Sequence, residues 1–235
     1  MIVARRIEQL AARHELPPGA VGALERLLEL LRDDPTAPTR VRDPGAAVDV
    51  HVADALVALD LDRVRSARRI ADLGTGAGFP GLVLAAALPD AAVALVEANG
   101  RKCAFLERAV EQMQLGNAEI VGARAESWAD GTASRDLVTA RAVAPLAVLV
   151  EYAAPLLAHD GALVAWKGRH DGEEERHGAA AAVATGLEAV EIRAVQPWNG
   201  AERLHLHVYV KVASTPNRYP RRPGMASKRP LRAST

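Results

Sequence analysis

The stretch from Arg69 to Gly81, R-I-A-D-L-G-T-G-A-G-F-P-G, constrains the fold of this chain more than any other. Residues 70–73 are apolar enough for a buried strand. Three glycines follow at alternate positions: Gly74, Gly76 and Gly78. Because glycine accepts positive φ and carries no Cβ, a ligand can lie directly against such a turn. Pro80 suits the first turn of a helix, so the stretch predicts a strand, a ligand-binding turn and a helix start.

Two classes of ligand compete for a turn of this kind. A dinucleotide site requires G-x-G-x-x-G, which would place glycine where Phe79 stands. The observed G-x-G-x-G, preceded by Asp72, resembles the first motif of the Rossmann-like methyltransferases, which hold S-adenosylmethionine. Such a site also needs an acid after the second strand, roughly 20 residues on, for the ribose hydroxyls. Glu97 follows the apolar segment 92–96 and meets this need; a glycine turn that merely joins strand to helix is the alternative.

The chain divides into a helical N-terminal part and an alternating part. Residues 1–16 and 19–32 predict two helices, and Asp43 can cap a third. Strands are expected near 69–73, 92–97, 118–122, 136–140, 161–166, 188–195 and 204–212, with helices near 80–88, 99–115, 145–157 and 173–185. This alternation predicts an α/β fold with a doubly wound sheet. We therefore expect a helical cap (1–60), a sheet domain (61–213) and a C-terminal tail (214–235).

Composition places the protein in a broad class. Of the 235 residues 49% are apolar, which is ample for a sizeable core. No apolar run approaches 18 residues, and Glu8 stands where a signal peptide needs an apolar block. The single cysteine, Cys103, excludes an internal disulfide and a cysteine-based metal site. We expect a cytoplasmic monomer without a metal and without a membrane span.

Charge is unevenly distributed along the chain. The 29 basic and 29 acidic residues balance, yet from Ser214 onward there are six Lys or Arg and no acid. A basic tail on an otherwise acidic domain suggests a polyanionic partner. A solvated, disordered tail is the alternative.

Polar side chains lie at or just beyond the carboxyl ends of the first five expected strands, the edge where doubly wound sheets bind ligands. They are Asp72, Glu97, Glu126, Arg141 and Lys167. Methyl transfer from a sulfonium is an in-line displacement in which proximity and orientation carry most of the rate. The Asn/Asp-Pro-Pro-aromatic run of exocyclic-amine methyltransferases does not follow the fourth strand, and Cys103 is expected in the core rather than as a nucleophile. The absence of both features favours an acceptor atom that already has an available lone pair, such as N7 of guanine.

Four histidine and acid positions are interpreted as structural on spacing alone. His51 and Asp54 lie three apart on the third helix, where a solvated polar face is expected. His205 and His207 share one face of the last strand, and no third metal ligand is evident. We expect both to be exposed strand residues.

Several segments together resemble the bacterial 16S ribosomal RNA guanine-N7 methyltransferase family, known as RsmG or GidB. In order, they are R-V-R-D-P with His51 and Asp54 downstream, D-L-G-T-G-A-G-F-P-G, R-K-C-A-F-L-E, A-R-A-E around Arg124, A-R-A around Arg141, K-G at Lys167, and the tail N-R-Y-P-R-R-P-G-M-A-S-K-R-P-L. The resemblance implies a Rossmann-like class I methyltransferase with a seven-stranded sheet, its last strand antiparallel, behind the helical cap. It implies S-adenosylmethionine as donor and a guanine of 16S rRNA, free or in the small-subunit particle, as acceptor.

The resemblance also implies roles for individual residues. Donor binding is expected of Gly74, Gly76, Gly78, Phe79, Glu97, Ala125, Glu126 and Arg141, and RNA binding of Arg124, Lys167, Arg203, Arg221 and Arg222. No general base is assigned, and His51 and Asp54 receive no role beyond joining cap to sheet. Loop 33–45 departs from the family's usual Trp and Asn-Leu-Thr run. Ion pairs are the alternative for Arg124 and Arg141, and a solvated position for Lys167.

Two other functions remain open on the sequence. A small-molecule methyltransferase of the same fold would ignore RNA and have no use for the basic tail. A non-catalytic binding module would bind S-adenosylmethionine or a nucleotide and transfer nothing.

Overall fold

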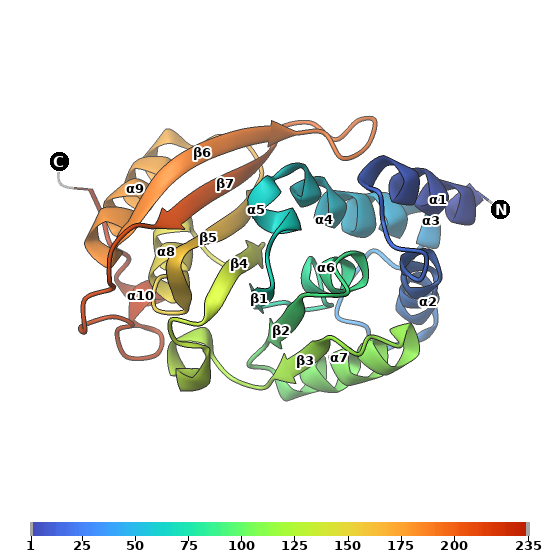
Figure 1. The fold of residues 1–235 in the computed structure, drawn as a ribbon, viewed down its shortest axis with the longest axis horizontal. Helices are drawn as coiled ribbons and strands as arrows, with labels where there is room; N and C mark the ends of the chain where they lie inside the picture. Colours follow the sequence, from blue (N-terminus) through green and yellow to red (C-terminus); the bar gives the residue numbers. More distant parts are fainter. Residues whose placement is uncertain (1, 234–235) are drawn as a thin grey trace.

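The computed structural model describes residues 2–233, which form a seven-stranded sheet covered by helices on both faces (Figure 1). The strands are β1 (Arg69–Leu73), β2 (Ala92–Val96), β3 (Ala118–Val121), β4 (Arg135–Arg141), β5 (Leu157–Lys167), β6 (Leu187–Val195) and β7 (Leu204–Lys211). Their order is β3-β2-β1-β4-β5-β7-β6, and β7 runs antiparallel to both of its neighbours. The predicted doubly wound sheet with an antiparallel last strand is confirmed.

Each face of the sheet has its own apolar core. The helices are α1 (Ile2–His14), α2 (Ala20–Asp33), α3 (Pro44–Ala47), α4 (Asp54–Leu56), α5 (Asp62–Arg65), α6 (Gly81–Ala87), α7 (Gly100–Met113), α8 (Leu146–Ala153), α9 (Gly172–Thr185) and α10 (Met225–Lys228). Side chains alternate along a strand, so Ile70 joins the core under the cap, α6 and α7, whereas Ala71 joins the core under α8 and α9. The cap helices therefore share one core with the sheet, and the division at residue 60 stays a prediction.

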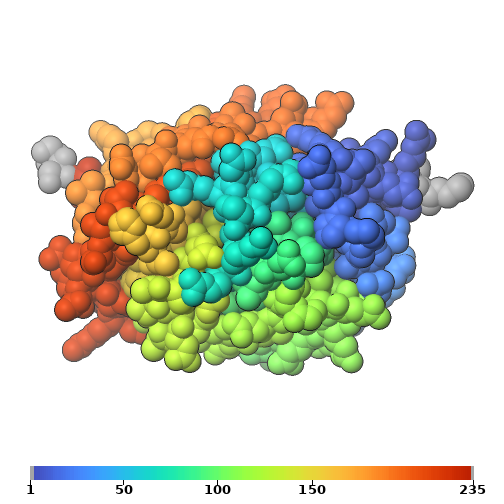
Figure 2. Space-filling view, viewed as in Figure 1, coloured from blue at the N-terminus to red at the C-terminus, as the bar shows by residue number. Residues whose placement is uncertain are grey.

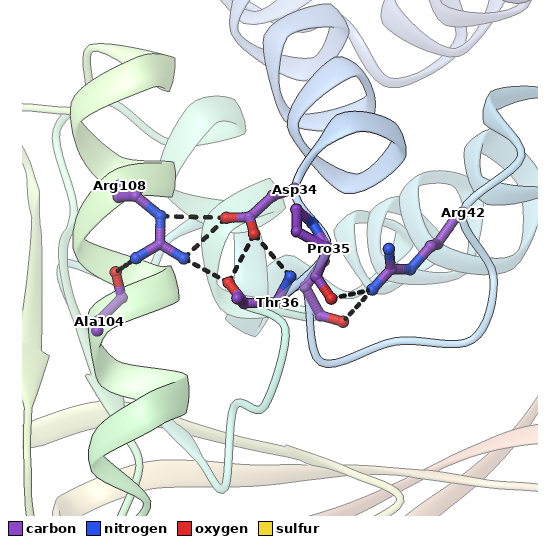
Figure 3. A network of polar contacts seen from close by, with 7 residues as sticks. Asp34, Pro35, Thr36, Arg42, Ala104 and Arg108 are labelled. Carbon is purple, nitrogen blue, oxygen red and sulfur yellow. Dashed lines mark hydrogen bonds and ion pairs between the residues drawn. The ribbon is translucent and has the colours of Figure 1, made fainter.

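The cap loop with the unusual sequence is fixed to α7 (Figure 3). The Asp34 carboxylate accepts hydrogen bonds from Arg108 Nη2 at 2.7 Å and from the Thr36 hydroxyl at 2.6 Å. These contacts, with the Thr36 hydrogen bond the largest, lower the pKa of Asp34 to about 2. Arg42 closes the loop by donating to the Pro35 carbonyl at 2.8 Å. A local polar network thus holds this loop in place.

The third cap helix begins as predicted but is not regular. Asp43 caps it by accepting a hydrogen bond from Ala46 N at 2.9 Å, with Pro44 in the first turn. Residues Val48–Ala53 then form a π-helical segment, a feature often found at functional sites. His51 and Asp54 are each only 7% exposed, so the expectation of a solvated polar face was wrong. Partners from distant parts of the chain cover both side chains.

The C-terminal tail is folded onto α8 and α9 rather than disordered, at least as far as residue 233 (Figure 1). Ala226 is buried, and Leu231 packs against the core under α8 and α9. Tyr152 of α8 and Ser227 join their hydroxyls at 3.0 Å. In Figure 2 the red surface of the tail adjoins the yellow surface near α8. The disordered-tail alternative is therefore wrong for the residues described.

Candidate active site

The three glycines of the turn after β1 all adopt positive φ: +61° at Gly74, +62° at Gly76 and +92° at Gly78. A Cβ on Gly78 would lie 2.1 Å from Leu82 Cδ1, and one on Gly74 would lie 2.9 Å from Val143 Cγ2. A Cβ on Gly76 would meet nothing closer than the Gly74 carbonyl at 3.7 Å. Gly74 and Gly78 are therefore needed for packing as well as conformation, whereas Gly76 borders open space.

A buried carboxylate organises this turn. Asp72, at the end of β1, accepts hydrogen bonds from the Thr75 hydroxyl at 2.6 Å, from Gly81 N at 2.9 Å and from the Thr139 hydroxyl at 2.9 Å. Burial raises the pKa of Asp72 to about 6 despite these donors. One side chain thus joins β1, the turn, the start of α6 and β4. The sequence placed Asp72 at this edge but gave no sign of this role, which depends on Thr139 from another strand.

Glu97 lies beside Gly76, where β1 and β2 end. Its Oε2 accepts a hydrogen bond from Gly76 N at 3.2 Å, and its Oε1 accepts one from Asn99 N at 2.9 Å. Lys102 Nζ lies 3.7 Å from Oε2. Glu97, the acid predicted to bind the ribose, therefore lies beside Gly76, the glycine that borders open space. Ribose binding itself stays a prediction. Cys103 is buried and its thiol donates to the Glu97 carbonyl at 3.2 Å, as expected of a core residue.

The turn after β3 carries the residues predicted to border the adenine. Ala125 and Glu126 lie in the 3-10 turn Ala125–Ser127, and Arg124 just before it is exposed. Glu126 Oε1 accepts a hydrogen bond from Gly224 N of the tail at 3.0 Å. The tail therefore reaches this turn, a link that the sequence did not predict.

Phe79 and Arg141 join the turn to the cap. The Phe79 ring stacks on His51 with centroids 4.4 Å apart, and the Arg141 guanidinium lies 5.4 Å from the Phe79 centroid. Arg141 Nη1 donates to Asp54 Oδ2 at 2.6 Å and to the Val50 carbonyl at 3.0 Å. Arg141 thus forms an ion pair with Asp54 in this structure, which was the alternative to a role in binding. Its part in donor binding stays a prediction, as does that of Phe79, which is almost fully buried.

The protonation of His51 follows from its neighbours. Arg141 Nη2 lies 3.2 Å from His51 Nδ1, and because a guanidinium only donates, Nδ1 must accept. The ring proton then sits on Nε2, 3.1 Å from the Thr39 hydroxyl. Burial first, and then the charge of Arg141, lower the pKa of His51 to about 4. Burial raises the pKa of Asp54, and Arg141 offsets part of that rise. The group is held as a neutral imidazole beside an ion pair.

The residues predicted to bind RNA fall into two sets. Lys167 Nζ lies 2.6 Å from Glu174 Oε1, so its side chain is paired rather than solvated. Arg221 donates through Nε at 2.7 Å and Nη2 at 2.5 Å to the Glu151 carboxylate, which is 1% exposed. The other three, which are exposed, are Arg124, Arg203 and Arg222. Only the exposed set presents its charge fully to solvent.

His205 and His207 are buried, so the expectation of exposed positions was wrong. The loop before α9 covers this face of β7, and its His170 ring lies 3.8 Å from the His205 ring between centroids. His205 Nδ1 lies 2.8 Å from the Gly168 carbonyl. Between residues 2 and 233, no three His, Cys, Asp or Glu side chains are grouped so as to hold a metal. No helix in that range is long and apolar enough to cross a membrane.

Comparisons of the sequence with known proteins place the chain in a family. The profile of the GidB family, described as rRNA small subunit methyltransferase G, matches residues 24–204. Ribosomal RNA small subunit methyltransferase G of Rubrobacter xylanophilus is 40% identical over 197 residues, covering 81% of this chain and 76% of that one. The protein of the same name from Symbiobacterium thermophilum is 38% identical over 228 residues, covering 92% of each chain.

A solved structure gives the same result for the fold. A SAM dependent methyltransferase from Aquifex aeolicus superposes with a TM-score of 0.55 at 13% identity, covering 80% of this chain and 98% of that one. The predicted Rossmann-like class I methyltransferase fold is confirmed. The methyltransferase family profile agrees with the predicted donor, S-adenosylmethionine. On its family profile and on two relatives near 40% identity over most of its length, the chain belongs to the rRNA small subunit methyltransferase G family, GidB.

Proposed function

We propose that this protein transfers a methyl group from S-adenosylmethionine to N7 of a guanine in 16S rRNA. The observation that carries the proposal is the open space at Gly76 beside the Glu97 carboxylate, at the carboxyl edge of β1 and β2. Ligands of doubly wound sheets bind at this edge. Family membership supports rRNA as the acceptor, because the relatives are named for the small-subunit RNA that they methylate.

The donor contributes an electrophilic methyl group on a sulfonium. Gly76 leaves room for its methionine part against the backbone, and Gly74 and Gly78 hold the turn in the required conformation. Glu97 has lone pairs left for the ribose hydroxyls, since each of its oxygens accepts one backbone hydrogen bond. Ala125 and Glu126 border the adenine side. Arg141 holds the cap against the turn through Asp54 and Val50.

No general base is required for this acceptor. N7 of guanine carries a lone pair and no proton, so positioning supplies the catalysis. The site agrees with this, because the imidazole of His51 is turned toward Arg141 and Thr39 rather than toward the open side of the turn. Arg124, Arg203 and Arg222 are exposed cations that suit phosphate contacts, which position RNA without reading its sequence.

Methyl transfer to small-subunit rRNA that lacks the modification tests the proposal. Labelled S-adenosylmethionine reports transfer, and borohydride followed by aniline cleaves the RNA at N7-methylguanosine. One cleavage band is expected. Label without cleavage would retain an RNA methyltransferase and reject N7 as the acceptor. No label on RNA, on assembly intermediates or on small subunits would favour a small-molecule methyltransferase or a binding module instead.

A further inference from the structure

A cavity of about 630 Å³ opens at the carboxyl edge of β4 and β5. Three parts of the chain line it: the loop 142–145 after β4, Lys167 with the first turns of α9, and the tail at Pro230 and Arg232. Its volume falls within the range of small-ligand sites, about 300 to 1,000 Å³. The cavity adjoins the glycine turn, because Val143 of its lining packs against Gly74. It therefore lies next to the place where the donor is proposed to bind.

The tail forms one wall of this cavity because polar contacts hold it in place, in addition to the Tyr152–Ser227 contact. Arg221 pairs with the buried Glu151, Gly224 N donates to Glu126, and Ala233 N donates to His177 Nδ1 at 3.1 Å. His177 itself lines the cavity. The folded tail therefore closes one side of the cavity, which would be open if the tail were not docked.

One carboxylate in the lining of this cavity, that of Glu174, has an oxygen without a hydrogen-bond donor among the described residues. Glu174 Oε1 accepts a hydrogen bond from Leu146 N at 2.8 Å and lies 2.6 Å from Lys167 Nζ in an ion pair. Its other oxygen, Oε2, accepts no hydrogen bond from any residue in the described range 2–233. The side chain is 22% exposed. Glu174 thus lines the cavity, is anchored through Oε1, and has the lone pairs of Oε2 left for a ligand.

We propose that this cavity receives the acceptor base, a guanine flipped out of the RNA, and that Glu174 Oε2 accepts hydrogen bonds from its N1–H and N2 amino group. The inference rests on the proposed function and specifies its acceptor site. Enzymes that act on a base read the flipped base at its Watson–Crick edge. Guanine presents two adjacent donors there, whereas adenine presents an acceptor at N1, so a carboxylate selects guanine. N7 lies on the opposite edge of the purine and would face Val143 and the glycine turn.

The same carboxylate assists the chemical step. The N7 lone pair forms the new N–C bond while the C–S bond of the donor breaks and its electron pair stays on sulfur. Positive charge passes from sulfur to the purine, and no proton is transferred. A carboxylate at the N1–H edge stabilises the purine cation more than neutral guanine, so it lowers the barrier as well as binding the base. Glu174 is therefore expected to affect kcat as well as KM.

Replacing one functional group on each partner tests the contact. Once the methylated position is mapped, small-subunit rRNA is prepared with guanosine or with inosine, which lacks the N2 amino group, at that position. The wild type should prefer guanosine in kcat/KM by about 10- to 150-fold, the range of one hydrogen bond to a charged group, because inosine lacks one of the two donors. Glu174→Gln should lower kcat on guanosine and reduce this preference to less than about 3-fold. Glu175→Gln is the matched control and should keep the wild-type preference, because Glu175 is next in α9, 23% exposed and paired with His170.

The outcomes separate the two proposals. If Glu174→Gln binds S-adenosylmethionine normally and keeps the wild-type guanosine preference, the acceptor-site inference is wrong while the proposed function stands. If the wild type forms no N7-methylguanosine, the proposed function itself fails. A second variant avoids the Lys167 and Leu146 contacts: Ala144→Phe fills the cavity from the loop after β4. It should retain donor binding and lose transfer by at least about 100-fold, and wild-type transfer by it would also overturn the inference.

Discussion

Two regions at the carboxyl edge of the sheet, one at β1 and β2 and one from β4 onward, differ in the contacts that hold their functional side chains in place. At β1 and β2, the glycine conformations and the Glu97 contacts with Gly76 and Asn99 all lie within about thirty residues of chain. From the end of β4 onward, two arginines depend on distant partners: Arg141 pairs with Asp54, and Arg221 pairs with Glu151. The first region is thus determined by local backbone conformation. In the second region, the cations first hold the cap and the tail in place, and only the exposed ones remain for RNA.

The sharpest contrast lies between two adjacent tail arginines. Arg221→Ala leaves the buried Glu151 carboxylate without its partner, and we expect the free energy of unfolding to fall by about 3 kcal/mol. Arg222 is exposed, so Arg222→Ala should change it by less than about 0.5 kcal/mol. Urea unfolding of both variants measures the difference. Equal losses would show that the ion pair does not hold the tail.

The region at β1 and β2 can be tested at its acid. Glu97→Ala removes the carboxylate proposed to bind the ribose, and hydrogen bonds to charged groups contribute about 1.5 to 3 kcal/mol. We therefore expect the Kd for S-adenosylmethionine to rise by roughly 10- to 150-fold, measured by calorimetry. Lys102→Ala, which removes a side chain 3.7 Å from the same carboxylate, is the control and should shift Kd less than about 3-fold. Similar effects from both would argue for a general charge effect instead of a ribose contact.

The burial of His51 between the cap and the glycine turn makes the free energy of unfolding depend on pH, in a direction that its lowered pKa determines. The pKa of His51 is about 4 in the folded protein and about 6.5 when unfolded. Its contribution to stability is therefore complete above pH 6.5 and is lost as the pH falls from 6.5 through 4, by up to about 1.4 kcal/mol per pH unit. Asp72, with its pKa raised to about 6, acts in the opposite direction, so the wild-type curve shows the sum. His51→Gln should remove the His51 part, and an identical acid-side slope in urea unfolding would contradict this.

The features that could be predicted from the sequence are those that depend on nearby residues. The features that depend on distant partners could not be predicted. Strand positions, the glycine turn and Glu97 beside it were predictable because they depend on local pattern and backbone conformation. The burial of His51 and Asp54 was not, because it depends on Arg141, some ninety residues away. For His205 and His207, the alternation showed that they share a face but not that α9 and His170 cover it. The role of Arg221 likewise required Glu151 to be located first.

The smallest expected effect concerns salt. Six tail cations were available from the sequence, but with Arg221 engaged five exposed ones remain: Arg218, Arg222, Lys228, Arg229 and Arg232. On single-stranded or looped RNA they would contribute about −3.5 to the slope of log K against log salt. Arg222→Ala alone should reduce the magnitude of the slope by about 0.7. Titrations between 50 and 200 mM salt measure it, and a slope unaffected by neutralising all five would exclude the tail from RNA contact.

The most direct test of the account is S-adenosylmethionine binding by Gly76→Val. Valine would project its side chain into the open space beside Glu97, while Gly116→Ala, at a glycine with nothing within 4 Å and no positive φ, controls for glycine replacement. Calorimetry on variants shown to be folded by circular dichroism should give wild-type affinity for Gly116→Ala and no detectable binding for Gly76→Val. Wild-type affinity in folded Gly76→Val would mean that the donor does not lie on the glycine turn, and the proposed site would have to be abandoned.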